Sequence, residues 1–127
     1  MFLVIQNGKY QEINEDPNLK IMQNCVGIPG KPAYIGMATN EFSDPHIDLV
    51  FDEEFLFKNL SPTCITPRTR NVLHGVVLAV ANKVSNEGVD TVGLTPEQAK
   101  IIKDELPIAT EIIGNLVVFE AGEHGEQ

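Results

Sequence analysis

Arg68 and Arg70, the only two arginines of the chain, have the side chains best suited to binding chemistry. A guanidinium group is planar and donates hydrogen bonds in a fixed fork, which suits bidentate contact with a phosphate or a carboxylate. In an extended loop, residues at i and i+2 point to the same side. Thr66, Thr69 and Asn71 surround the pair with further hydrogen-bond donors. This spacing predicts a site for a small anion or a partner protein.

The acidic run Asp52-Glu53-Glu54 offers a second candidate surface and also an alternative explanation of the arginines. The simplest interpretation of the run is a solvated turn, and the functional one is contact with a basic patch on a host protein. The apolar residues Phe55-Leu56-Phe57 that follow are either core, the favoured interpretation, or an exposed interface anchor. In the alternative explanation, Arg68 and Arg70 form ion pairs with acidic side chains of the same chain, such as those of this run. Exposed ion pairs of that kind contribute only ~0–1 kcal/mol to stability.

His74 lies inside the longest apolar run, beside Gly75, where a missing side chain permits close approach of a ligand or another backbone. An imidazole there would serve as a general base, with Cys64 as a conceivable nucleophile. No third residue that would orient the histidine is identifiable from the sequence. A hydrogen-bonded structural histidine is therefore the favoured interpretation. An enzyme or nucleotide-handling protein with an Arg68, Arg70 and His74 pocket remains the alternative.

The elements that position these residues predict an α+β fold, a mainly antiparallel sheet covered by two short helices. Residues 72–81 have the length and the Val and Leu content of a central strand buried on both faces, preceded by a loop over 61–71. Asn7-Gly8 and Gly114-Asn115 are typical two-residue hairpin turns. Asp16-Pro17 is predicted to open the first helix, which ends at Gly27, and the capping box Thr95-Pro96-Glu97-Gln98 opens the second, which ends before Pro107. Further strands are predicted over 33–39 and 46–51, and a loop over 82–93 with a reversal at 86–88.

The size and charge of the chain limit its organisation and its partners. A length of 127 residues predicts one domain over residues 1–120 and a flexible tail over 121–127. The net charge of −9 disfavours binding to nucleic acid or to an anionic membrane, although a local basic spot would still hold a small anion. The same charge leaves open an acidic mimic of nucleic acid. Unpaired sheet edges favour a homo-oligomer.

Cysteine and histidine usage gives no sign of a metal or a cofactor. Cys25 and Cys64 are the only cysteines and are predicted to be free thiols in a reducing compartment. His46 and His124 have no histidine or cysteine at ligand spacing. The amino terminus is too short and lacks the basic residues for a signal peptide, so we expect a cytoplasmic protein without cofactor or metal.

The order of these motifs resembles a small uncharacterised family found in bacteriophages, plasmids and bacterial genomes. The similar segments are 2–13, 19–27, 52–54, 60–70, 72–77 with Gly75 in register, and 93–98. A longer segment at 40–45 and an added hairpin after Pro107 depart from the pattern. The resemblance implies a fold pattern and a mobile-element origin, and no activity.

Together these observations favour a non-enzymatic binding module of phage or mobile-element origin. It would bind a host protein or sequester a small anionic ligand.

Overall fold

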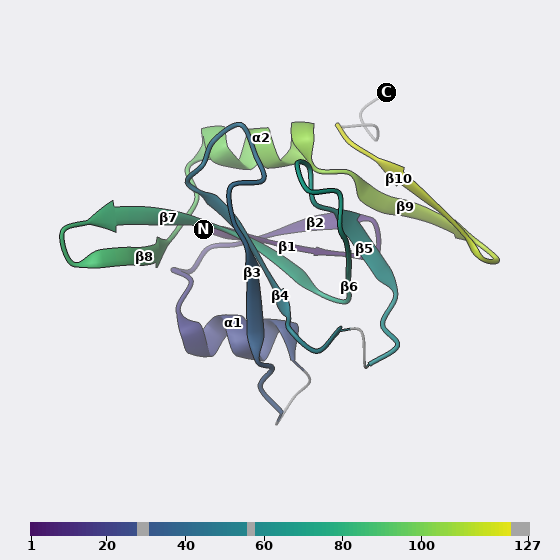
Figure 1. Ribbon diagram of the computed structural model, residues 1–127, viewed down its shortest axis with the longest axis horizontal. Coiled ribbons are helices and arrows are strands. Elements are labelled where there is room, and N and C mark those ends of the chain that lie inside the picture. Colours follow the sequence, from purple (N-terminus) through teal and green to yellow (C-terminus); the bar gives the residue numbers. More distant parts are fainter. Residues whose placement is uncertain (28–30, 56–57, 123–127) are drawn as a thin grey trace.

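The computed structural model describes residues 1–27, 31–55 and 58–122 and confirms the α+β fold (Figure 1). Its two helices are α1 (Leu19–Val26) and α2 (Pro96–Glu105). The strands are β1 (Phe2–Gln6), β2 (Lys9–Ile13), β3 (Ile35–Ala38), β4 (Ile47–Asp52), β5 (Pro62–Ile65), β6 (Val72–His74), β7 (Val77–Ser85), β8 (Gly88–Val92), β9 (Ile108–Ile113) and β10 (Leu116–Glu120).

The strands form two antiparallel sheets. The first has the order β2-β1-β7-β4-β3, and β8 pairs with the outer half of β7. Strand β7 is central, because Ala79 lies opposite Leu3 of β1 on one side and opposite Leu49 of β4 on the other. The second sheet has the order β10-β9-β5-β6. The β7–β8 and β9–β10 hairpins extend from opposite sides of the molecule (Figure 1).

The first sheet is buried on both faces because its alternate residues pack into separate apolar clusters. On one face, Leu3 and Leu49 pack in a cluster with Ile102 and Leu106, from α2 and its C-cap, and with residues of the second sheet. The opposite face forms a second cluster that α1 covers, and its members include Phe2, Val4, Met22, Val26 and Val80. Figure 1 shows the two helices on opposite sides of the sheet. The α2 side is the one that holds the cavity described below.

The prediction of one strand over residues 72–81 is wrong. Residues 72–74 form β6 in the second sheet, and the chain passes into the first sheet through Gly75, whose φ is +79°. A Cβ at Gly75 would lie 2.7 Å from the Leu60 side chain, so glycine suits this corner both in backbone conformation and in space. The buried central strand is confirmed only for its β7 part, where Val77 to Ala81 are buried.

Three other boundaries differ from the sequence prediction. The predicted loops over 61–71 and 82–93 contain β5 and the β7–β8 hairpin, although the reversal near 86–88 is confirmed. Helix α1 begins at Leu19 rather than at Asp16-Pro17, because the Asn18 side chain accepts the Ile21 N–H at 2.9 Å and caps the helix. The residues 56–57 that follow Phe55, and the predicted tail beyond residue 122, lie outside the described residues.

Several local predictions are confirmed. Asn7 and Gly8 have φ values of 53° and 72°, as the two-residue turn between β1 and β2 requires. The Thr95 side chain accepts the Gln98 N–H while the Gln98 side chain accepts the Thr95 N–H, which completes the capping box of α2. Gly114-Asn115 joins β9 to β10.

Candidate functional site

The two arginines lie in the loop that closes the β5–β6 hairpin, and this loop is a compact turn. Thr66 N–H donates to Asn71 O at 2.8 Å, and Arg70 N–H donates to Thr66 O at 3.0 Å. Arg70 has a φ of 62°, in the left-handed region. The expected extended loop is therefore wrong, because these hydrogen bonds fold the segment back on itself. In such a turn, residues at i and i+2 are not held on the same side of the chain.

A buried carboxylate holds this loop in place. Glu41 is 6% exposed, and its Oε1 accepts the N–H groups of Arg68 and Thr69 at 2.8 and 2.9 Å. Its Oε2 accepts the Thr69 hydroxyl at 2.7 Å. Burial alone would raise the pKa of this carboxyl, but the hydrogen bonds from Thr69 and Arg68 and the Arg68 charge lower the pKa below its usual value. Glu41 is thus an ionised anchor that sequence reasoning missed.

The polar side chains around the arginines form hydrogen bonds within the loop. The Thr66 hydroxyl accepts the Asn71 N–H at 2.8 Å, and it is also 2.8 Å from the Thr69 hydroxyl. The Asn71 amide donates to the Thr69 hydroxyl at 3.2 Å. Arg68 donates from Nε to Asn40 O at 2.8 Å. Arg68 and Arg70 are both exposed.

The structure does not bring His74 together with the arginines. His74 pairs with Pro62 at the open end of the β5–β6 hairpin, whereas the arginines lie in the loop at its closed end. The His74 Nδ1 lies 2.9 Å from Leu60 O, and its ring stacks on Phe55 with centroids 5.4 Å apart. This arrangement corresponds to a hydrogen-bonded structural histidine.

Cys64 is placed where a nucleophile would be ineffective. It is fully buried in β5, and burial raises the pKa of its thiol to about 12. The reactive form of cysteine is the thiolate, which is scarce at neutral pH when the pKa is so high. Its cross-strand partner is Leu73, not His74. The structure provides no Cys64–His74 pair for covalent catalysis.

The acidic run is divided between the interior and the surface. Asp52 is 2% exposed and accepts Lys58 Nζ at 2.6 Å and the Glu54 N–H at 2.9 Å, so its carboxylate holds the turn together. Glu53 and Glu54 are exposed. In the described part of the chain, the run forms its ion pair with Lys58 and none with an arginine.

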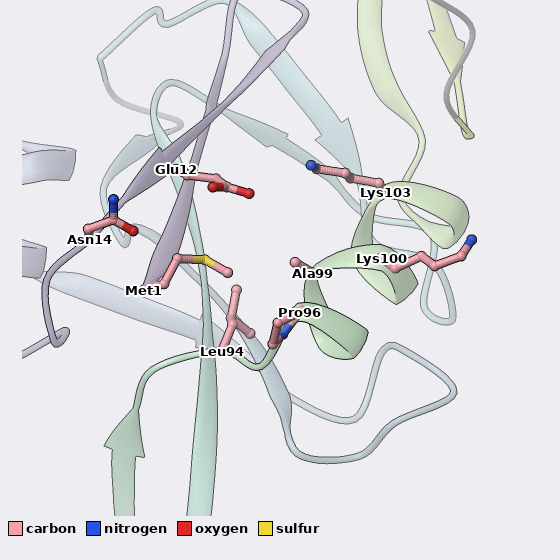
Figure 2. A pocket seen from close by; sticks show the side chains of 8 residues that line it. All are labelled: Met1, Glu12, Asn14, Leu94, Pro96, Ala99, Lys100 and Lys103. Atoms are coloured by element: carbon pink, nitrogen blue, oxygen red, sulfur yellow. The ribbon is translucent and has the colours of Figure 1, made fainter. Parts of the chain in front are cut away.

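On the α2 side of the first sheet, a cavity of about 590 Å³ lies between the β1–β2 hairpin and α2 (Figure 2). We call it the α2 cleft. It is lined by Met1, Glu12, Asn14, Leu94, Pro96, Ala99, Lys100 and Lys103.

One charged side chain points into the α2 cleft from the β1–β2 hairpin and one from α2 (Figure 2). Glu12 lies opposite Leu3 in the β1–β2 register, so it is on the face of the sheet that α2 covers. Lys103 lies four residues after the buried Ala99 and therefore on the same side of α2. In Figure 2 the Glu12 carboxylate and the Lys103 ammonium point toward each other across the cavity. Lys100 points away, and its ammonium pairs with Asp104 at 2.9 Å.

Apolar residues form the floor of the cleft between these charges. Leu94 and Ala99 are 7% and 5% exposed, and the Met1 side chain extends between them and Glu12 in Figure 2. Leu94 N–H donates to Met1 O at 2.7 Å, which ties the start of β1 to the segment before α2. The sequence predicts a hairpin that includes Glu12 and a helix that includes Lys103, but only the docking of α2 places the two residues on facing walls (Figure 2).

No group of three His, Cys, Asp or Glu side chains in residues 1–27, 31–55 and 58–122 is arranged to hold a metal ion. No helix within these ranges combines the length and apolar character needed to cross a membrane. Comparisons with family models, with curated proteins and with solved structures each gave no match. The family resemblance therefore stays a prediction.

Proposed function

We propose that the protein is a non-enzymatic binding module of mobile-element origin that holds a small charged ligand in the α2 cleft. The cleft itself is the observation that supports this function. Its volume of about 590 Å³ falls within the roughly 300–1,000 Å³ that is usual for small-molecule sites. Its walls combine an apolar floor with a few charged groups, which is the composition of such sites. Binding requires this complementarity alone. The enzymatic alternative would require Arg68, Arg70 and His74 in one pocket, and they lie at opposite ends of the β5–β6 hairpin.

A thermal-shift screen of small metabolites tests this function, because a ligand that binds only the folded state raises the melting temperature. The screen is run on the wild type and on the double variant Glu12→Gln/Lys103→Gln, with Lys20→Gln as control. Lys20 is an exposed lysine of α1, on the opposite side of the sheet. We expect at least one compound to stabilise the wild type and Lys20→Gln but not the double variant. Stabilisation by no compound, or equal stabilisation of all three proteins, would contradict the proposal.

A second candidate function is recognition of a host protein or a small anion by Arg68 and Arg70. The observation that favours it is a pair of exposed arginines on a loop that the buried Glu41 holds rigidly. They place two exposed positive charges on a chain of net charge −9. The variants Arg68→Ala and Arg70→Ala are expected to lose a partner captured from host lysate, or to lose phosphate binding, while keeping the wild-type melting temperature. Unchanged capture and unchanged phosphate binding would remove this candidate.

A further inference from the structure

Building on the proposed function, we infer that the ligand of the α2 cleft is a small zwitterion, a molecule with an ammonium and a carboxylate joined by an aliphatic segment. Glu12 binds the ammonium, Lys103 binds the carboxylate, and the aliphatic segment lies on Leu94, Ala99 and Met1.

Two opposite charges face each other across the α2 cleft without forming an ion pair. Glu12 comes from β2 and Lys103 from α2, and both side chains point into the cavity (Figure 2). The ion pairs of the described residues are Lys58–Asp52 and Lys100–Asp104, and neither includes Glu12 or Lys103. A carboxylate and an ammonium on facing walls each attract a ligand group of opposite charge, because charges interact more strongly in a partly enclosed site than in bulk water.

A ligand that carries only a positive or only a negative charge would be repelled by one wall of the α2 cleft. An anion attracted by Lys103 would face the Glu12 carboxylate across the same cavity, and a cation attracted by Glu12 would face the Lys103 ammonium. Lys100 does not change this balance, because its ammonium is turned away and paired with Asp104. A zwitterion in one orientation satisfies both walls at once. Its two charges also fix the direction in which it lies.

The size and the floor of the α2 cleft also suit a small zwitterion. A volume of about 590 Å³ lies within the range of small-molecule sites and is enough for an amino acid or a very short peptide. The floor between the charges is apolar and nearly closed to solvent at Leu94 and Ala99. Methylene groups pack on such a surface, and the flexible Met1 thioether adapts to their length.

A series of ω-amino acids from glycine to 6-aminohexanoate tests the inference, with the alkylamine and the carboxylic acid of equal length as comparisons. Affinities are measured by NMR titration of the full chain. We expect one spacer length to bind best, at least tenfold tighter than either comparison compound. Equal affinity of the zwitterion and a comparison compound, or binding of no zwitterion, would overturn the inference.

Charge-swapped variants make the test specific to the two side chains. Glu12→Lys and Lys103→Glu are each expected to weaken binding of the best zwitterion at least tenfold, and the double swap is expected to restore binding in the reversed orientation. Lys20→Glu changes the net charge as much as Lys103→Glu does and should bind like the wild type. Loss of binding in Lys20→Glu, or no recovery in the double swap, would overturn the assignment. A metabolite whose binding requires only one of Glu12 and Lys103 would overturn the zwitterion but leave the proposed function intact.

Discussion

Removal of the Glu41 carboxylate is expected to lower both stability and its dependence on pH. The side chain is 6% exposed and accepts three hydrogen bonds from Arg68 and Thr69. A hydrogen bond to a charged group contributes ~1.5–3 kcal/mol, but water can reach the exposed loop and replace part of each bond. We therefore expect Glu41→Ala to lower the free energy of unfolding by about 2–4 kcal/mol. Glu41→Gln keeps an acceptor but loses the charge, and we expect a loss of about 1 kcal/mol.

The sign of the pH dependence follows from the lowered pKa of Glu41 in the folded state. Its stabilising contribution is fully present above the unfolded pKa of about 4.3 and is lost as the pH falls through the lower, folded pKa. Urea denaturation of the wild type and Glu41→Gln at pH 7 and at successively lower pH measures the difference. We expect the difference to shrink as the solution becomes more acidic. Equal stability at pH 7, or a difference that does not change with pH, would refute this account of the loop.

Three further predictions concern the core. Asp48 is 3% exposed. Its Oδ2 accepts a hydrogen bond from the Asn82 side chain, and its Oδ1 has no hydrogen-bond partner among the described residues. Burial raises the pKa of this carboxyl, although the Asn82 hydrogen bond acts in the opposite direction. Because ionisation then opposes folding above that pKa, Asp48→Asn is expected to raise the urea midpoint at pH 7 and to raise it less in acid; a lower midpoint at pH 7 contradicts this. Cys25 is partly exposed and should react with a thiol reagent in the native protein, whereas the buried Cys64 should react only on unfolding; equal rates contradict the burial of Cys64. Ile102→Ala, at a fully buried site, should cost about 2–5 kcal/mol in the same urea assay, and a loss below about 1 kcal/mol would contradict the packing of α2.

The elements that could be predicted from the sequence are those held by hydrogen bonds between residues close together in the chain. The Asn7-Gly8 turn and the Thr95–Gln98 capping box depend on residues at most three positions apart, so their residue types alone indicate the structure. The division of the run over 72–81 at Gly75 was not predictable from hydrophobicity, because strands of both sheets are apolar. The corner depends on residues distant in the chain, since Gly75, with a φ of +79°, donates its N–H to Ser61 O at 2.8 Å.

The candidate sites likewise depend on contacts between residues that are far apart in the chain, which the sequence does not reveal. The arginine loop was found from residue type, but its anchor Glu41 lies 27 residues before Arg68 in the chain and carries no local signal. Glu12 and Lys103 are ordinary surface residues in the sequence. They form a cleft only because α2 docks beside the β1–β2 hairpin.

Crystals of the protein soaked with the best-binding zwitterion would show both where the ligand binds and in which direction it lies. We expect one molecule in the α2 cleft, with its ammonium at Glu12 and its carboxylate at Lys103. A molecule bound at Arg68 and Arg70 instead, or a cleft that stays filled with solvent alone at a saturating concentration, would contradict it.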